Sequence, residues 1–240
     1  MDWTSIWERR LEEYLKSVPR AGYFIKKYFG KSVSSILEVG GGSCKDSIYL
    51  ANNGFSCICS DKNKYVIEIL KKKFNEKNKN IIFDIQDALN LTYKENSFDL
   101  VFSNGLIIYF YDNREVIKIL EEKCRVAKKF VITIVHNKHN KRLVKKFKTL
   151  AEKDELYNIR FYSIDELINI AENLKYNKKI KKYYIMKFGG IFDLIYYALA
   201  RIFGKDNEII DFFGNIVPLL YRIQPISLTE RLALIIEIGD

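Results

Sequence analysis

No apolar run in this sequence approaches the ~20 residues that a membrane-spanning helix needs. The longest apolar stretches lie near Phe188–Leu199 and Phe212–Tyr221, and they are interrupted or bounded by Asp193, Arg201, Gly214 and Pro218. The first residues, MDWTSIWERRLEEY, are too charged for a signal peptide. These absences predict a soluble, cytoplasmic protein.

Cysteine is scarce, and its spacing does not suggest a metal site. The four cysteines are Cys44, Cys57, Cys59 and Cys124, and they include no CxxC pair. Cys57 and Cys59 are two residues apart in a strand-like run, so their side chains should face the same side. We expect neither a metal site nor a disulfide framework, but reduced thiols buried in the core of a cytosolic protein.

Internal repeats and low-complexity linkers are absent, and there are only three prolines. The chain of 240 residues therefore predicts a single domain, 1–240. Within it we expect N-terminal helices over 1–30 and a cofactor-binding core over 31–136. Two helical insertions, 137–161 and 188–226, are the parts able to form a cap over a substrate.

The net charge of +10 raises the question of a nucleic-acid partner. Much of the excess lies in Lys138–Lys182, but the chain is rich in Lys, Asn, Ile and Tyr throughout. Charge runs usually form a solvated face, so a nucleic-acid groove is not favoured.

Short apolar strands alternate with amphipathic helices from Ser35 onward, which is typical of a parallel sheet with helices on both faces. The predicted strands are Ser35–Val39, Phe55–Ser60, Asn80–Ile85, Phe98–Ser103, Phe130–Val135, Lys178–Lys187 and Leu232–Ile238. The predicted helices among the first five strands are Cys44–Asn53, Lys64–Asn75 and Asn113–Cys124.

Other helices are predicted outside this regular region. Trp3–Phe29 is largely helical with a break at Pro19, and it forms either a lid over a ligand or a helix packed on the sheet edge. Ser163 and Glu166 form a capping box that starts another helix. Ile191–Phe203 and Ile209–Tyr221 each carry an apolar stripe: Phe192, Ile195, Leu199 and Ile202 in the first, and Ile209, Phe213, Ile216 and Leu220 in the second.

The stretch ILEVGGGSCKDSIYL, residues 36–50, joins a strand to a helix through three glycines. Such a turn lets backbone N–H groups approach a cofactor closely. A dinucleotide site would need Gly-x-Gly-x-x-Gly, but Lys45 stands at the third position. Glu38, just before the turn, would suit a cationic ligand and would be a poor neighbour for a pyrophosphate.

These residues resemble the acid-x-Gly-x-Gly-x-Gly loop of class I S-adenosylmethionine-dependent methyltransferases, and the likeness covers roughly Tyr23–Lys187 plus the final strand. It implies a Rossmann-like α/β fold with a seven-stranded, mostly parallel sheet whose last strand is antiparallel. It also implies that Gly40, Gly41 and Gly42 wrap the methionine part of S-adenosylmethionine and that Glu38 holds its ammonium. Cys44 departs from the pattern, since the family usually has glycine there.

The resemblance assigns further cofactor contacts. Asp61, with Lys62 beside it, follows the second strand, where a carboxylate accepts hydrogen bonds from the ribose hydroxyls. Asp87 and Ala88 follow the third strand and would hold the adenine. The residues after the fourth strand, Asn104, Gly105 and Leu106, would border both the cofactor and the substrate.

The expected function is methyl transfer to an oxygen or nitrogen of a small-molecule acceptor. His136, past the fifth strand, and Tyr109 are the candidate proton acceptors, and His139 lies three residues beyond the first. An aminopropyltransferase is disfavoured, because Ser103, Asn104 and Gly105 replace the acids such enzymes use after the fourth strand.

Two alternatives stay open. In the first, the chain is a non-catalytic or RNA-associated module that binds S-adenosylmethionine. This alternative predicts that its basic surface binds RNA with a steep salt dependence and that no methyl group is transferred. The helix pair Ile191–Tyr221 would dock on a membrane surface if the acceptor is linked to a lipid.

Overall fold

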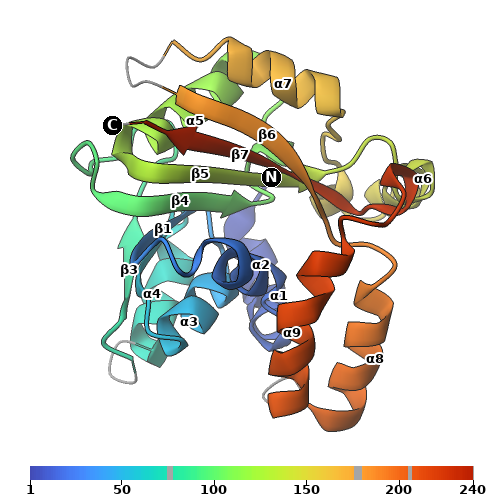
Figure 1. Ribbon diagram of the computed structural model, residues 1–240. Helices are drawn as coiled ribbons and strands as arrows, with labels where there is room; N and C mark the ends of the chain where they lie inside the picture. The colour runs from blue at the N-terminus through green and yellow to red at the C-terminus, as the bar shows by residue number, and fades with distance from the viewer. Residues whose placement is uncertain (75–77, 176–179, 205–206, 240) are drawn as a thin grey trace.

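A seven-stranded sheet runs through the computed structural model, which describes residues 1–74, 78–175, 180–204 and 207–239 (Figure 1). The strands are β1 (Ser35–Val39), β2 (Ser56–Asp61), β3 (Ile81–Ile85), β4 (Phe98–Asn104), β5 (Ala127–His136), β6 (Ile180–Phe188) and β7 (Arg231–Ile238). The α-helices are α1 (Trp3–Lys16), α2 (Arg20–Phe29), α3 (Lys45–Asn52), α4 (Lys64–Phe74), α5 (Asn113–Val126), α6 (Lys141–Ala151), α7 (Ile164–Glu172), α8 (Asp193–Phe203) and α9 (Glu208–Leu220).

The strand order is β3-β2-β1-β4-β5-β7-β6, and the first five strands of the chain are parallel to one another. Strand β7 lies antiparallel between β5 and β6. This architecture confirms the predicted fold class. Because β7 is antiparallel, its first residue, Arg231, pairs with His136 at the carboxyl end of β5.

Alternating side chains build a core on each face of the sheet. Ile36 and Phe102 pack on one side together with α2, α3 and α4, while Leu37 and Val101 pack on the other with α5 and α7. A strand that is buried on both faces reads as a continuous apolar run, which is why β1 and β4 were recognisable in the sequence.

The predicted elements agree closely with the structure at most positions. The capping box of Ser163 and Glu166 is present at the start of α7, as predicted. Asn75 of the helix predicted before β3, and the first two residues of the strand predicted over 178–187, lie outside the described residues. Strand β5 begins three residues earlier than predicted, because Ala127 pairs with Phe98 of β4.

The α8–α9 hairpin extends away from the sheet beside α2 (Figure 1). The predicted apolar stripes form only part of its packed face. Phe192, Leu199 and Phe213 pack against the core, but Ile195 and Ile202 are 54% and 71% exposed, whereas Tyr196 and Ile210, outside the stripes, are buried. Most positions of these helices are apolar, so periodicity does not single out the packed face. Among the described residues, no helix combines the length and apolarity needed to cross a membrane.

Candidate functional site

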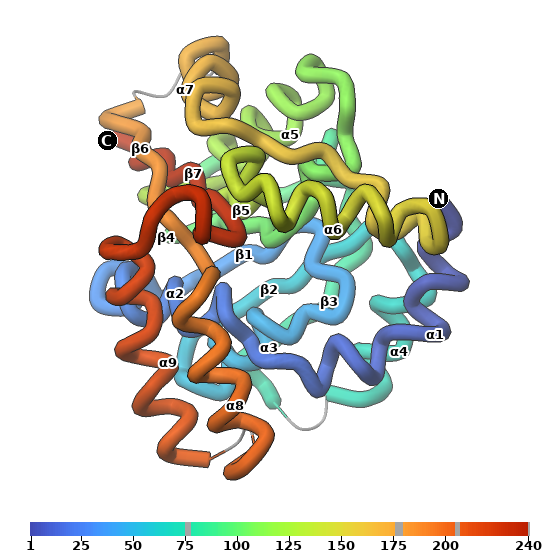
Figure 2. The backbone as a smooth tube through the Cα atoms, turned by 90° about the vertical axis from the view of Figure 1, so that its right-hand side faces the viewer, coloured from blue at the N-terminus to red at the C-terminus, as the bar shows by residue number. Residues whose placement is uncertain are grey.

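A cavity of about 550 Å³ lies at the carboxyl ends of the parallel strands. Figure 2 views this region with α6 above the strands β1, β2 and β3 and with α1 to their right. Every site residue predicted from the sequence lines it: Glu38, Gly40, Gly41, Gly42, Asp61, Lys62, Asp87, Ala88, Asn104, Gly105, Leu106, Tyr109 and His136. The topology brings them together because parallel strands place their carboxyl ends at one edge.

The glycine turn follows β1 directly. Gly40 and Gly42 have φ angles of +65° and +54°, a backbone region that disfavours most side chains. A Cβ on Gly40 would lie 2.5 Å from Leu106, and one on Gly42 would collide with the ring of Trp7. Cys44 also has a positive φ, +54°, immediately before α3 begins. The close approach of Leu106 and Trp7 therefore requires glycine at positions 40 and 42.

Glu38 is a buried carboxyl group without a basic partner. Its Oε2 accepts hydrogen bonds from the backbone N–H and the hydroxyl of Ser47, and no Lys or Arg of the described residues forms an ion pair with it. Burial and the negative charge of Asp46 raise the pKa of Glu38 to about 8. The site would therefore gain stability from a cationic group placed beside this carboxyl.

Asp61 and Asp87 lie at the ends of β2 and β3. Asp61 accepts hydrogen bonds from the N–H groups of Gly42 (2.9 Å) and Asn63 (2.8 Å), which fixes its carboxyl against the glycine turn. Asp87 pairs with Lys62 at 2.6 Å and accepts from the N–H of Leu89. The Lys62 hydrogen bond lowers the pKa of Asp87, so this group is an anion at neutral pH.

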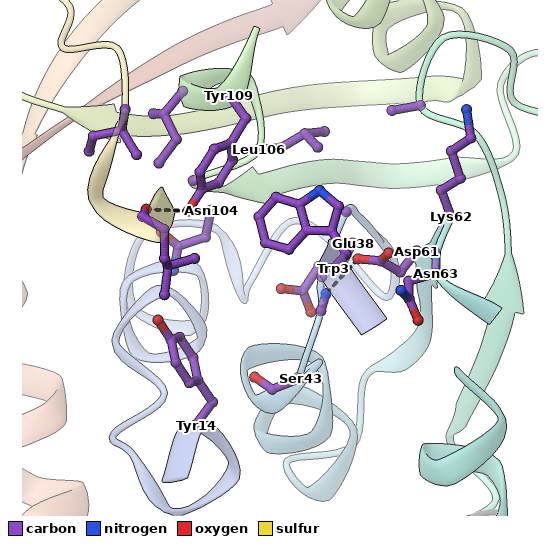
Figure 3. A pocket seen from close by; sticks show the side chains of 18 of the residues that line it. Trp3, Tyr14, Glu38, Ser43, Asp61, Lys62, Asn63, Asn104, Leu106 and Tyr109 are labelled. Carbon is purple, nitrogen blue, oxygen red and sulfur yellow. Dashed lines mark hydrogen bonds between the residues drawn. The ribbon is translucent and has the colours of Figure 1, made fainter. Parts of the chain in front are cut away.

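The cavity has two sides, and Trp3 lies between them. In Figure 3, Asp61, Lys62 and Asn63 lie on one side of Trp3, and Tyr14, Asn104 and Tyr109 lie on the other. The first side, with the glycine turn, fits a nucleoside and an amino-acid ammonium: it offers acceptors, a close backbone and an unpaired buried carboxyl. The residues present therefore fit the cofactor that the sequence implies.

His136 and Tyr109 belong to the second side. His136 is 5% exposed, its ring packs 5.0 Å from Phe147 and 5.7 Å from Phe161, and its Nδ1 has no hydrogen-bond partner. Burial lowers the pKa of His136 well below its usual value, so the ring is neutral at pH 7. Tyr109 donates a hydrogen bond to the carbonyl of Leu156, and burial raises its pKa. Of the two, only His136 offers an unused nitrogen.

Helix α1 covers the glycine turn and is tied to both sides of the cavity. Arg10 pairs with Asp154, and Glu12 pairs with Lys73 of α4. The ring of Trp3 lies edge-on to Tyr109 at 4.8 Å. Of the two positions predicted for the N-terminal helices, α1 takes the lid position, while α2 packs in the core.

Trp3, Trp7 and Tyr14 line the cavity from the N-terminal segment for which a lid was one of the two predicted positions. Several other lining residues were not predicted from the sequence: Ser43, Lys45, Asp46, Asn63, Gln86 and Arg231. Asn63, Gln86 and Arg231 are far from the glycine turn in sequence and carry no motif, and Lys45 served only to exclude a dinucleotide site. Of the two predicted cap segments, 137–161 contributes Phe147, Leu156, Tyr157 and Ile159 to the cavity. None of the described residues of 188–226 lines it, since α8 and α9 pack against each other and α9 against α2.

The expectation of four reduced cysteines is wrong. Cys44 and Cys59 form a disulfide, with their Cα atoms 5.9 Å apart, while Cys57 and Cys124 are free and buried. Cys59 faces the glycine turn, where a Cβ on Gly41 would collide with its sulfur. The bond therefore ties the start of α3 to β2, a contact that spacing along the chain cannot show because the turn folds back over the strand.

The chain is similar to known proteins in part of its sequence and in its fold. Residues 36–129 match a family model described as a methyltransferase domain. No curated protein sequence matches the chain. Among solved structures, an S-adenosylmethionine-dependent methyltransferase from Thermotoga maritima has a TM-score of 0.61 and 17% identity, over 98% of this chain and 99% of that one.

Two further solved structures are similar. An S-adenosylmethionine-dependent methyltransferase from Archaeoglobus fulgidus gives a TM-score of 0.61 at 16% identity, over 94% of this chain and 97% of that one. Phosphoethanolamine N-methyltransferase 2 from Haemonchus contortus, in complex with S-adenosylmethionine, gives 0.64 at 16% identity. That match covers 100% of this chain and 60% of the nematode protein, and at such identities the likeness concerns the fold.

Proposed function

We propose that this chain is a class I S-adenosylmethionine-dependent methyltransferase and that it methylates a small-molecule acceptor at an oxygen or nitrogen atom. One observation carries the proposal: every residue that the sequence assigned to donor or acceptor lines the same cavity. A volume of about 550 Å³ lies within the usual range for small-molecule sites. A structural relative from Haemonchus contortus, crystallised with phosphomonomethylethanolamine, lends support to a small acceptor.

Glu38, Asp61 and Asp87 bind the cofactor in this proposal. Glu38 faces its ammonium, Asp61 accepts from the ribose hydroxyls, and Asp87 with Ala88 holds the adenine. Gly40 and Gly42 let the backbone approach it. The chemistry that S-adenosylmethionine supplies when bound is an electrophilic methyl group on a positively charged sulfur.

The other side of the cavity positions the acceptor for in-line displacement. Alignment of two reactants in a closed site contributes about 7–11 kcal/mol in well-oriented systems. Asn104, Leu106 and Tyr109 line the cavity, and α1 contributes Trp3, Trp7 and Tyr14 to its wall. His136, which is neutral and has an unused nitrogen, accepts the proton that the nucleophile loses. Tyr109 orients the acceptor through a hydrogen bond from its hydroxyl or through contact with its ring. It is not the base, because burial raises its pKa and keeps the phenol protonated.

Binding of S-adenosylhomocysteine, the demethylated product, tests the cofactor site. We expect saturable binding by calorimetry and a change in tryptophan fluorescence, since both tryptophans of the chain line the cavity.

Asp61→Ala should weaken binding about 10- to 100-fold, because charge-assisted hydrogen bonds to the ribose are lost. Asp61→Asn keeps an oxygen that accepts from the Gly42 N–H, so its loss of affinity for S-adenosylhomocysteine should be smaller. Asp165→Ala, on the exposed start of α7, is the matched control. Binding of NAD in place of S-adenosylhomocysteine would contradict the proposal.

His136 should be neutral throughout the neutral range. In a ¹⁵N-resolved NMR titration, its ring signals are expected to show no midpoint near 6.5, because burial lowers the pKa. The chain has two histidines, so the His139→Gln variant assigns the signals. For an acceptor found by screening, His136→Gln should lower kcat about 100-fold, the lower end for general-base groups. His139 does not line the cavity, and an equal loss in His139→Gln would exclude the assigned role.

A further inference from the structure

Two cations line the acceptor side of the cavity, and neither belongs to the proposed cofactor contacts. They are Lys45, the first residue of α3, and Arg231, the first residue of β7. The inference drawn from them rests on the proposed function, because it concerns the molecule that receives the methyl group.

Arg231 is only partly used by the protein. Its Nη1 donates to Oδ1 of Asn104, and its Nε lies 3.3 Å from Glu230. Glu230 is itself engaged by both Nη1 and Nη2 of Arg20, at 2.8 and 2.9 Å, so it gives Arg231 a single, longer contact. Among the described residues, none accepts a hydrogen bond from Nη2 of Arg231, whose side chain is 18% exposed. A planar donor edge of the guanidinium is thus left for a ligand.

Lys45 approaches the same space from α3. Its ammonium donates to the hydroxyl of Ser17 at 2.5 Å and lies 5.7 Å from the centre of the Tyr14 ring. No carboxylate of the described residues lies within ion-pair distance of it. The acids that act on it electrostatically are Glu38 and Asp46, and Asp46 accepts hydrogen bonds from the Gly22 N–H and from Asn104. Burial lowers the pKa of Lys45 to about 8, so the group is a cation at neutral pH.

Arg231 is the shared neighbour of this side of the cavity. After burial, its positive charge contributes to lowering the pKa values of Lys45 and His136. The same charge partly offsets the rise in pKa that burial causes in Tyr14 and Tyr109. His136 pairs directly with Arg231 across β5 and β7 and leaves Nδ1 buried without a partner. Unpaired buried donors and charges are costly, and a ligand that supplies acceptors here would remove that cost.

We propose that the acceptor carries an oxyanion, a carboxylate or a phosphate, which Arg231 binds through its guanidinium with Lys45 beside it. The aromatic rings of Tyr14, Tyr109 and Tyr157 contact the body of the acceptor, and its nucleophilic atom faces His136. Arginine suits this role because its fork matches the two oxygens of a carboxylate or phosphate. Arg231 therefore selects the acceptor by charge.

Intrinsic fluorescence reads this site directly, since Trp3 and Trp7 are the only tryptophans and both line the cavity. The experiment saturates the protein with S-adenosylhomocysteine and titrates inorganic phosphate in one arm and acetate in the other, with calorimetry in parallel. The two arms distinguish a phosphate from a carboxylate acceptor. The variants are Arg231→Met, Arg231→Lys as a folding control that keeps the charge, and Lys182→Met. Lys182 is 61% exposed and pairs with Glu237 at the opposite end of β7, so its loss removes the same charge elsewhere.

The expected result is saturable binding of at least one anion by the wild type and the Lys182→Met variant. Arg231→Met should weaken it about 10- to 100-fold, the loss typical of a charge-assisted hydrogen-bonded pair. Affinity for S-adenosylhomocysteine should stay within about twofold of wild type. No anion response in the wild type, or an equal loss in Lys182→Met, overturns the inference. A large loss of S-adenosylhomocysteine affinity in Arg231→Met also overturns it, because the arginine would then bind the cofactor's own carboxylate. If the wild type does not bind S-adenosylhomocysteine at all, the proposed function itself fails.

Discussion

Glu38→Gln is expected to make the ligand-free protein more stable at pH 8 and, at the same time, to weaken cofactor binding strongly. The carboxyl group is buried, and burial with the nearby charge of Asp46 raises its pKa from 4.5 to about 8. Between these two values the folded state holds a proton that the unfolded state has lost. Stability therefore falls as the pH rises from about 5 to 8, because the slope follows the protons bound by the unfolded state minus those bound by the native state.

The size of the effect follows from the same linkage. Each factor of ten in the proton dissociation constant corresponds to about 1.4 kcal/mol, so we expect a gain on the order of 4 kcal/mol for the glutamine variant at pH 8. For a chain of this length that is about 8–16 °C in Tm. Glutamine keeps an oxygen that accepts from Ser47, so the hydrogen bond to the start of α3 survives.

Thermal unfolding of both proteins between pH 5 and 9 measures this difference. The wild-type Tm should fall with pH, and the variant curve should be flatter. Saturating S-adenosylhomocysteine should raise the Tm of the wild type more than that of the variant, since only the carboxylate pairs with the ammonium of the ligand. Glu12→Gln, at an exposed carboxyl of α1, is the matched control and should keep the wild-type slope. Parallel curves for wild type and Glu38→Gln would show that the carboxyl has no such role.

Reduction of the Cys44–Cys59 disulfide gives the second large effect. The bond joins residues 15 apart, and closing a loop of about that length contributes about 3 kcal/mol in the chain-entropy model. We expect the Cys44→Ala, Cys59→Ala double variant to lose a similar free energy of unfolding and therefore to unfold at a lower temperature. Reductant should lower the Tm of the wild type but cause no further change in the double variant, which serves as the internal control.

A thiol count decides whether the bond forms in solution. Unfolded without reductant, the wild type should show two reactive thiols, from Cys57 and Cys124, and four after reduction. Four thiols before reduction would contradict the disulfide. Disulfides are rare in the reducing cytosol, so the same count also tests the cytoplasmic location predicted from the sequence.

The parts of the site that were predictable are those that follow directly from strands. Glu38, Asp61 and Asp87 each lie at or just beyond the end of an apolar strand, and parallel pairing brings such ends together. Arg231 could not be found in this way, because β7 is antiparallel and its beginning, not its end, reaches the cavity. Trp7 reaches the glycine turn only through packing of α1, which no local pattern encodes.

The helical hairpin was difficult to predict for a different reason. Alternation identifies a buried face only where polar residues mark the other one, and Ile195, Ile202 and Phe212 are exposed although apolar. The disulfide shows the same limit. Cys44 and Cys59 approach each other because the turn folds over β2, a tertiary contact between two positions that no local pattern links.

The place of β7 in the sheet sets an order of events during biosynthesis. Strand β6 is synthesised before β7, but β7 is its only neighbour in the sheet among the described strands, so β6 cannot join until the chain has continued through the α8–α9 hairpin. At about 5–20 residues per second, that interval lasts seconds. Strands β1 to β5 need nothing that comes later for their own pairing. Under the proposed function, the strands that bind the methyl donor thus pair on the ribosome before the acceptor side is completed, which happens only when Arg231 reaches its place beside His136.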